Sequence, residues 1–172
     1  MSLVVMGIDP GLANTGWALI ECEGSRYRVR SYGCIKTEPG LPLPDRLDAI
    51  HSRVRELVEV ERPDECAVEN VYFSKNVKTA FSTGQARGVA ILATAGAGIP
   101  VEEYGPGEVK LAVTGNGSAE KSQVAFMVQR LLGISELPKP DHAADALAVA
   151  ICHANCRGMK RAVAASSDGA SR

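Results

Sequence analysis

The sequence predicts an α/β domain organised around one buried strand. Residues 3–8 are apolar except for Gly7 and lead directly into Asp9 and a Pro10-Gly11 turn, which predicts a central strand. Residues 15–22 follow after a short connection and favour an antiparallel hairpin with it. Residues 65–71 come after a helical segment, which favours parallel pairing beside the first strand. The sheet is therefore expected to be mixed.

The rest of the chain also divides into elements by its apolar spacing and turn residues. Further strands are predicted at 27–36 and 98–104, and helices at 45–62, 77–95, 119–132 and from 141, with a short helix around Lys110. Proline-rich residues 38–44 are expected to be irregular. Phe81 is expected in the core, and Ser118 is expected to cap the 119–132 helix.

Composition limits the classes of function. The chain has 172 residues, 45% hydrophobic and 23% charged, which suits one compact domain. Its formal net charge of −1 predicts that any nucleic-acid surface is local. No apolar run is long enough to span a bilayer, and no signal peptide is evident. An odd number of cysteines, five, favours free thiols in a reducing cytoplasm.

Three acidic side chains occupy positions predicted to be buried. Asp9 ends the first strand, and Glu69 interrupts the 65–71 strand near its carboxyl end. Ligands collect at the carboxyl ends of neighbouring strands in open sheets, and two carboxylates there would repel without a cation between them. Asp145 lies in a helix that is apolar nearly all round, with His142 three residues earlier on the same face. Oxygen ligands of this kind suit hard divalent cations. The alternative role for Asp9 is that it only opens the turn. Asp141 lies in the same helical turn as His142 and Asp145, and its alternative role is to cap the helix.

Residues 72–88 carry no acidic side chain and follow Glu69 closely. Aromatic rings that stack on bases and cations that contact phosphates are typical of single-stranded nucleic-acid binding. The candidate residues are Tyr72, Phe73, Lys75, Lys78 and Arg87.

Two other patterns are weaker. Residues 115–122 nearly match a phosphate-binding loop, but Glu120 replaces its second glycine and no strand precedes it, so a helix start with Lys121 near a phosphate is favoured. Cys152, His153 and Cys156 offer three zinc ligands without an evident fourth, which favours ordinary helix packing.

Several motifs, in order along residues 3–156, resemble the RuvC family of Holliday junction resolvases. They are Gly7-Ile-Asp-Pro-Gly11, Thr15-Gly-Trp17, Val68-Glu69, Gly84-Gln-Ala-Arg-Gly88, Gly117-Ser-Ala-Glu-Lys-Ser122 and His142-Ala-Ala-Asp-Ala-Leu147. The resemblance implies a ribonuclease-H-like α/β fold, with a five-stranded mixed sheet in the order 3-2-1-4-5 flanked by helices. We expect this nuclease domain to cover residues 1–156 and a flexible basic tail to cover residues 157–172.

The resemblance also implies a function. The implied protein is a crossover junction endodeoxyribonuclease, a homodimer that nicks a four-way DNA junction symmetrically in recombination and repair. Its products would carry 5′-phosphate and 3′-hydroxyl ends, and its expected partner is a branch-migration complex (RuvA and RuvB). A cytoplasmic protein is expected. The alternatives are a nucleotide-binding ATPase of the actin-like or sugar-kinase type, whose first phosphate loop has a similar pattern, and a non-catalytic junction-binding protein.

Carried over by motif, Asp9, Glu69, His142 and Asp145 are the expected ligands of two divalent cations, Mg²⁺ or Mn²⁺. The family has Asp or His at the position of His142. We expect Asp141 to cap the helix and to contact the metal ligands without binding the metal itself. Imidazole is a softer donor than carboxylate, so Mn²⁺ is predicted to serve at least as well as Mg²⁺. Lys110 and Lys121 match the family's DNA-binding lysines, and Tyr72, followed by Phe73, matches its aromatic residue.

Overall fold

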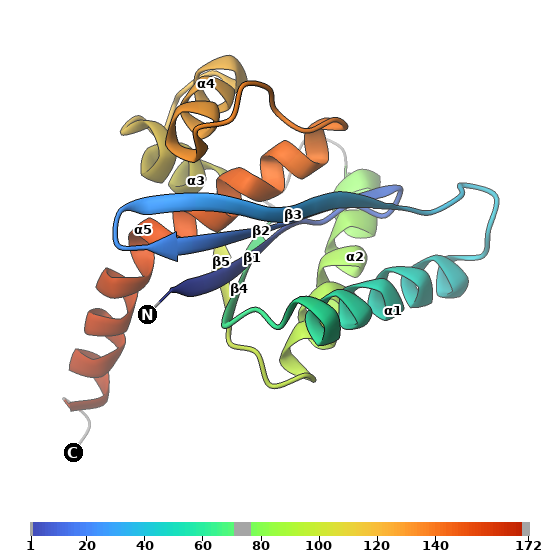
Figure 1. Ribbon diagram of the computed structural model, residues 1–172. Helices are drawn as coiled ribbons and strands as arrows, with labels where there is room; N and C mark the ends of the chain where they lie inside the picture. Colours follow the sequence, from blue (N-terminus) through green and yellow to red (C-terminus); the bar gives the residue numbers. More distant parts are fainter. Residues whose placement is uncertain (1, 71–76, 170–172) are drawn as a thin grey trace.

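The computed structural model describes residues 2–70 and 77–169. Its centre is a five-stranded sheet in the order β3-β2-β1-β4-β5 (Figure 1). The strands are β1 (Leu3–Asp9), β2 (Asn14–Glu23), β3 (Arg26–Lys36), β4 (Glu65–Glu69) and β5 (Val101–Tyr104). The β1 strand pairs antiparallel with β2 and parallel with β4, and β5 pairs parallel with β4. The predicted mixed sheet and its order are confirmed.

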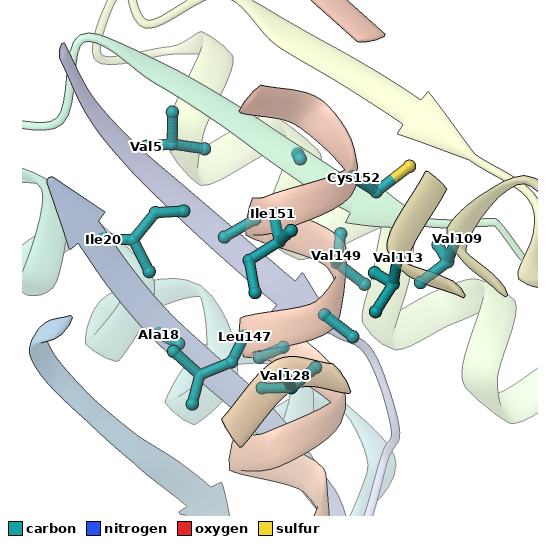
Figure 2. Close-up of a cluster of buried hydrophobic side chains, with 14 of the residues drawn as sticks. Val5, Ala18, Ile20, Val109, Val113, Val128, Leu147, Val149, Ile151 and Cys152 are labelled. Carbon is teal, nitrogen blue, oxygen red and sulfur yellow. The ribbon is translucent and has the colours of Figure 1, made fainter. Parts of the chain in front are cut away.

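Helices cover both faces of this sheet. On one face lie α1 (Leu43–Glu61) and α2 (Val77–Ala95), and on the other lie α3 (Pro106–Thr114), α4 (Lys121–Leu132) and α5 (Asp141–Gly169). Because side chains alternate along a strand, Val5 joins the core under α5, whereas Met6 and Ile8 join the core under α1. Figure 2 shows the first of these cores, where α5 contributes Leu147 and Ile151.

The α5 helix lies unusually close to β1 and β2. A Cβ atom on Gly16 would lie 1.9 Å from the backbone oxygen of His142, and a Cβ on Gly7 would lie 2.1 Å from that of Ala146. Only glycine fits at either position without moving the helix, because real Cβ atoms do not approach backbone this closely. These contacts fix where the first turns of α5 lie relative to the end of β1.

Three local predictions were wrong. The α1 helix begins at Leu43, inside the proline-rich segment, because Pro44 occupies the first turn, where a missing N–H removes no helical bond. The α4 helix begins at Lys121, and its cap is Glu120 rather than Ser118; the Glu120 backbone N–H donates to Gln123 Oε1 at 2.8 Å. Phe81 is 70% exposed and lies outside the core.

The C-terminal helix also continues past the predicted boundary at residue 156. It runs to Gly169, since residues 157–169 are rich in helix-forming Ala, Lys, Arg and Met. Arg157 is tied to the fold through bonds to Glu65. None of the described helices combines the length and apolar character needed to cross a membrane. All five cysteines are free thiols.

Candidate functional site

Two carboxylates meet at the ends of the central parallel strands. Asp9 is the last residue of β1 and Glu69 the last of β4, and the register that pairs Ile8 with Val68 places them side by side. Their side chains are close enough to share a hydrogen bond. The sheet therefore brings together two residues that are 60 positions apart in the sequence.

The first turns of α5 complete this acidic cluster. His142 Nδ1 lies 2.8 Å from Asp9 Oδ2. One possible ligand atom from each of Asp9, His142 and Asp145 lies within 4.8 Å of the others. Because His142 and Asp145 are three residues apart, they share the helix face that Gly16 allows against the sheet. The four predicted ligands thus occupy one site, with Glu69 beside Asp9.

The ionised forms of the carboxylates in this site are electrostatically unfavourable. Burial, and then the neighbouring Asp9 and Asp145 carboxylates, raise the pKa of Glu69 to about 8. Burial also raises the pKa of Asp9, although the hydrogen bond from His142 opposes that rise. A group of carboxylates that resists ionisation in this way favours a bound cation, because the cation would offset both burial and mutual repulsion.

Two lysines border the cluster. Lys121, at the start of α4, places its Nζ atom 3.3 Å from Asp145 Oδ2 and 3.5 Å from Asp141 Oδ2. Burial lowers the pKa of Lys121, but these two carboxylates outweigh it and hold the pKa above its usual value. Lys110 and Lys121 line a groove of about 280 Å³ together with Glu69 and Asp145. Both predicted phosphate contacts therefore open onto the acidic cluster.

Asp141 stands apart from that cluster. Its side chain is 78% exposed, and Lys121 is its partner. Asp141 is the first residue of α5, and His142 rather than Asp141 belongs to the group of possible ligands. The geometry favours a role for Asp141 in holding Lys121.

The remaining predicted DNA contacts divide into two groups. Arg87 of α2 forms an ion pair with Glu103 of β5, and its side chain is only 25% exposed, so its position favours a structural role. Lys78 lies in the first turn of α2. Tyr72, Phe73 and Lys75 fall outside the described residues.

A second polar cluster was not predicted from the sequence. His153, which is 2% exposed, lies between Tyr104 of β5 and Glu65 of β4, and Glu65 also binds Arg157. The signals for it were a glutamate at the start of a buried strand and a histidine in an apolar helix, neither of which identifies its partner.

The fold and the site together define a class: a ribonuclease-H-like α/β protein that gathers carboxylates at the ends of its central parallel strands. Residues 5–153 match the family model described as Crossover junction endodeoxyribonuclease RuvC. The chain belongs to the RuvC family of crossover junction endodeoxyribonucleases.

Individual relatives agree with this assignment. The chain is 52% identical to the crossover junction endodeoxyribonuclease RuvC of Desulforamulus reducens, over 88% of this chain and 93% of that protein. Its identity to the Brevibacillus brevis protein of the same name is 54%, over 90% and 93% of the two chains. The structure of T. thermophilus RuvC in complex with Holliday junction substrate superposes with a TM-score of 0.87 at 40% identity, covering 92% and 96%.

The raised pKa of Glu69 predicts a pH-dependent stability in the absence of metal. Below about pH 4.5 Glu69 is protonated in both the folded and unfolded chain, but between pH 4.5 and 8 only the unfolded chain ionises it, so the folded state loses stability as pH rises. Glu69→Gln removes this loss. In EDTA at pH 8.5 we expect Glu69→Gln to raise Tm by about 2–4 °C or more, since about 1 kcal/mol shifts Tm by that amount in a domain of this size.

Two comparisons make this prediction specific. The gain should shrink towards zero at pH 4.5, and the exposed Glu136→Gln should show no such gain at either pH. Saturating Mn²⁺ should stabilise the wild type more than Glu69→Gln, because the cation binds the ionised carboxylates of the native state. A Glu69→Gln variant that is no more stable than the wild type at pH 8.5 would contradict the burial of this charge.

Proposed function

We propose that this chain is a structure-selective endonuclease that resolves four-way DNA junctions by paired nicks. The observation that carries the proposal is the clustering of Asp9, Glu69, His142 and Asp145 beside two lysines, in a chain that is 40% identical to a RuvC whose structure contains a Holliday junction. Nicks on two strands require two copies of such a site, so we propose that a homodimer acts. The branch-migration partner (RuvA and RuvB) and a cytoplasmic location are part of the same proposal.

The donor set fits two divalent cations. Three carboxylates and one imidazole provide mainly oxygen ligands. Burial, together with repulsion from neighbouring carboxylates, raises the pKa of Asp9 and of Glu69, so a cation would favour their ionised forms. Divalent cations held there would supply Lewis-acid polarisation of a phosphodiester and make water a better nucleophile near neutral pH. In the tautomer with a proton on Nδ1, His142 donates to Asp9 and keeps the Nε2 lone pair available for a cation.

The neighbouring lysines fit contacts with DNA phosphates. Lys121 is anchored by Asp145 and Asp141 but remains 67% exposed, so its ammonium group can face the groove while it stays beside the cluster. Lys110 reaches the same groove from α3. Together they would hold the phosphate backbone next to the carboxylates, and hydrolysis there would leave 5′-phosphate and 3′-hydroxyl ends. The stacking of Tyr72 and Phe73 on DNA bases stays a prediction.

Replacing any one of Asp9, Glu69 and Asp145 by Asn tests the metal-ligand role. Nicking of a synthetic junction in Mg²⁺ should fall by at least about 100-fold, since changes to groups that merely support ligands already cost 10–100-fold. Junction affinity in EDTA should stay the same or increase, because a negative charge beside the phosphate has been removed. Parallel loss of binding and cleavage would show that these residues only maintain the fold.

The wild type provides the test of the whole proposal. It should nick an intact four-way junction on opposing strands in Mg²⁺ or Mn²⁺ and should leave a linear duplex of the same sequence uncut. Binding of ATP in calorimetry together with no nicking would favour the nucleotide-binding alternative. Junction binding without nicking in either metal would favour the non-catalytic one.

His142 should set the choice of metal. An imidazole weakens a site for Mg²⁺ more than for Mn²⁺, because Mg²⁺ prefers oxygen ligands and affinity at nitrogen ligands rises along the first transition row. We expect the wild type to nick as well or better in Mn²⁺, and His142→Asp to shift the preference towards Mg²⁺. If Asp141 were the ligand, Asp141→Asn would abolish nicking and His142→Asp would leave the preference unchanged.

The lysines should contribute to binding in a salt-dependent way. Lys110→Ala and Lys121→Ala should each weaken junction binding and reduce the slope of log affinity against log salt by about one unit, as expected for one lost phosphate contact. Arg53→Ala is a matched control, since Arg53 is an exposed cation on α1, across the sheet from the groove. An unchanged slope in both lysine variants would refute the phosphate contacts.

A further inference from the structure

The second polar cluster joins the same elements as the candidate site. His153 Nε2 lies 2.6 Å from Glu65 Oε2, and His153 Nδ1 lies 2.9 Å from the Tyr104 hydroxyl. Arg157 forms two bonds with the Glu65 carboxylate, one of them from Nε at 2.9 Å. His153 and Arg157 lie on α5, Glu65 on β4 and Tyr104 on β5. We call these four residues the buried network.

The protonation states within the buried network are consistent with one another. Burial lowers the pKa of His153, and the bonds from Arg157 lower the pKa of Glu65 to about 2. A neutral imidazole then donates from Nε2 to the Glu65 carboxylate and accepts from the Tyr104 hydroxyl at Nδ1, while Arg157 balances the charge of Glu65. Each of these hydrogen bonds then has a defined donor and acceptor, and the observed position of the helix against the strands makes all of them.

The buried network and the acidic cluster are two cross-connections between the same pair of elements. On β4 the carboxylates of the two clusters, Glu65 and Glu69, are four residues apart, which is about 13 Å of strand. On α5 Asp145 and His153 are eight residues apart, which is about 12 Å of helix. Because these lengths match, the helix position that satisfies His153 at one end places Asp145 opposite Glu69 at the other.

The β5 strand strengthens this connection. Tyr104 is paired in register with Glu69, and its backbone oxygen accepts a hydrogen bond from Asn70 N at 2.8 Å. The Tyr104 hydroxyl reaches His153 from the same residue. A displacement of α5 along its axis would therefore break bonds to the residue that is paired with Glu69.

Apart from the His142–Asp9 contact and the exposed Tyr27–Asn155 bond, α5 meets the sheet mainly through packing of a different kind. Small residues such as Ala146 and Ala150 lie against Gly7, and apolar packing of this sort is non-directional. Directional buried hydrogen bonds are better suited to select one position of α5 along the helix axis. If such a bond is not made, a buried polar group is left without a partner, which costs free energy.

We propose that Tyr104, His153, Glu65 and Arg157 are positioning residues that set the place of α5 along its axis and so hold His142 and Asp145 in ligand geometry opposite Asp9 and Glu69. The inference rests on the proposed metal-dependent function of that cluster. It assigns a role in metal affinity to residues that do not touch the metal.

Tyr104→Phe tests the inference because it removes one hydroxyl and keeps the ring. We expect the Mn²⁺ concentration that half-saturates the protein, followed by the rise in Tm and by calorimetry, to increase about tenfold, the lower end of the effect of residues that orient metal ligands. The metal dependence of nicking should move in the same way, while junction affinity in EDTA stays at the wild-type value.

Tyr27→Phe is the matched control. Tyr27 also donates its hydroxyl to α5, to Asn155, but it does so from β3 at an exposed position. Both variants can lower Tm, yet only Tyr104→Phe should weaken Mn²⁺ binding. Equal Mn²⁺ affinities in Tyr104→Phe, Tyr27→Phe and the wild type, or equal losses in the two variants, would overturn the positioning role.

A second pair of variants covers the case in which Tyr104→Phe fails to fold. His153→Gln keeps a donor and an acceptor and should retain more Mn²⁺ affinity than His153→Leu, which keeps neither. Equal affinities in these two variants would also overturn the inference. These outcomes can be distinguished from failure of the proposed function. A wild type that binds Mn²⁺ but does not nick a junction would refute the nuclease. The same Mn²⁺ binding measurements on the variants would still decide the positioning role.

Discussion

The first turns of α5 can reach the end of β1 only because the sheet presents backbone there instead of side chains. Gly16 lies against the carbonyl of His142 and Gly7 against that of Ala146, at separations that no Cβ would allow. The closeness of this contact brings His142 to within hydrogen-bond distance of Asp9. The acidic cluster therefore depends on the absence of side chains at Gly7 and Gly16, beneath α5.

The same site stores unfavourable electrostatics that the fold must offset. Asp9 and Glu69 lie at the boundary of the core, and burial raises the pKa of both. The two apolar cores on either side of the sheet supply the stability that allows such charges to be held together. Lys121, which lines the groove, partly compensates the negative charge of the cluster through its ion pair with Asp145. A cation would complete that compensation, so binding of metal and stability of the fold are linked.

Sequence predicted the parts of this arrangement that depend on local patterns. Periodicity and connection rules predict that Asp9 and Glu69 lie at or near the carboxyl ends of their strands. They also predict the helix from Asp141 and the parallel placement of β4. The partners of His153 did not, because Glu65 is 88 residues away and pairing at that distance leaves no local pattern. Arg87 was expected at a phosphate, and the structure pairs it with Glu103; sequence could not show that partner, since a cation near an aromatic segment looks the same whichever partner it has. The length of α5 was also missed, because a small, polar and basic composition suits both a tail and a helix.

The most direct test of this account is Gly16→Ala, compared with Gly40→Ala, whose Cβ would have nothing within 4 Å. The measurement is Mn²⁺ binding by calorimetry, with circular dichroism and cooperative unfolding to establish that each variant is folded. If close approach of α5 builds the site, folded Gly16→Ala should lose at least about tenfold in Mn²⁺ affinity and lose junction nicking with it, while Gly40→Ala matches the wild type. Wild-type Mn²⁺ affinity and nicking in Gly16→Ala would contradict the account.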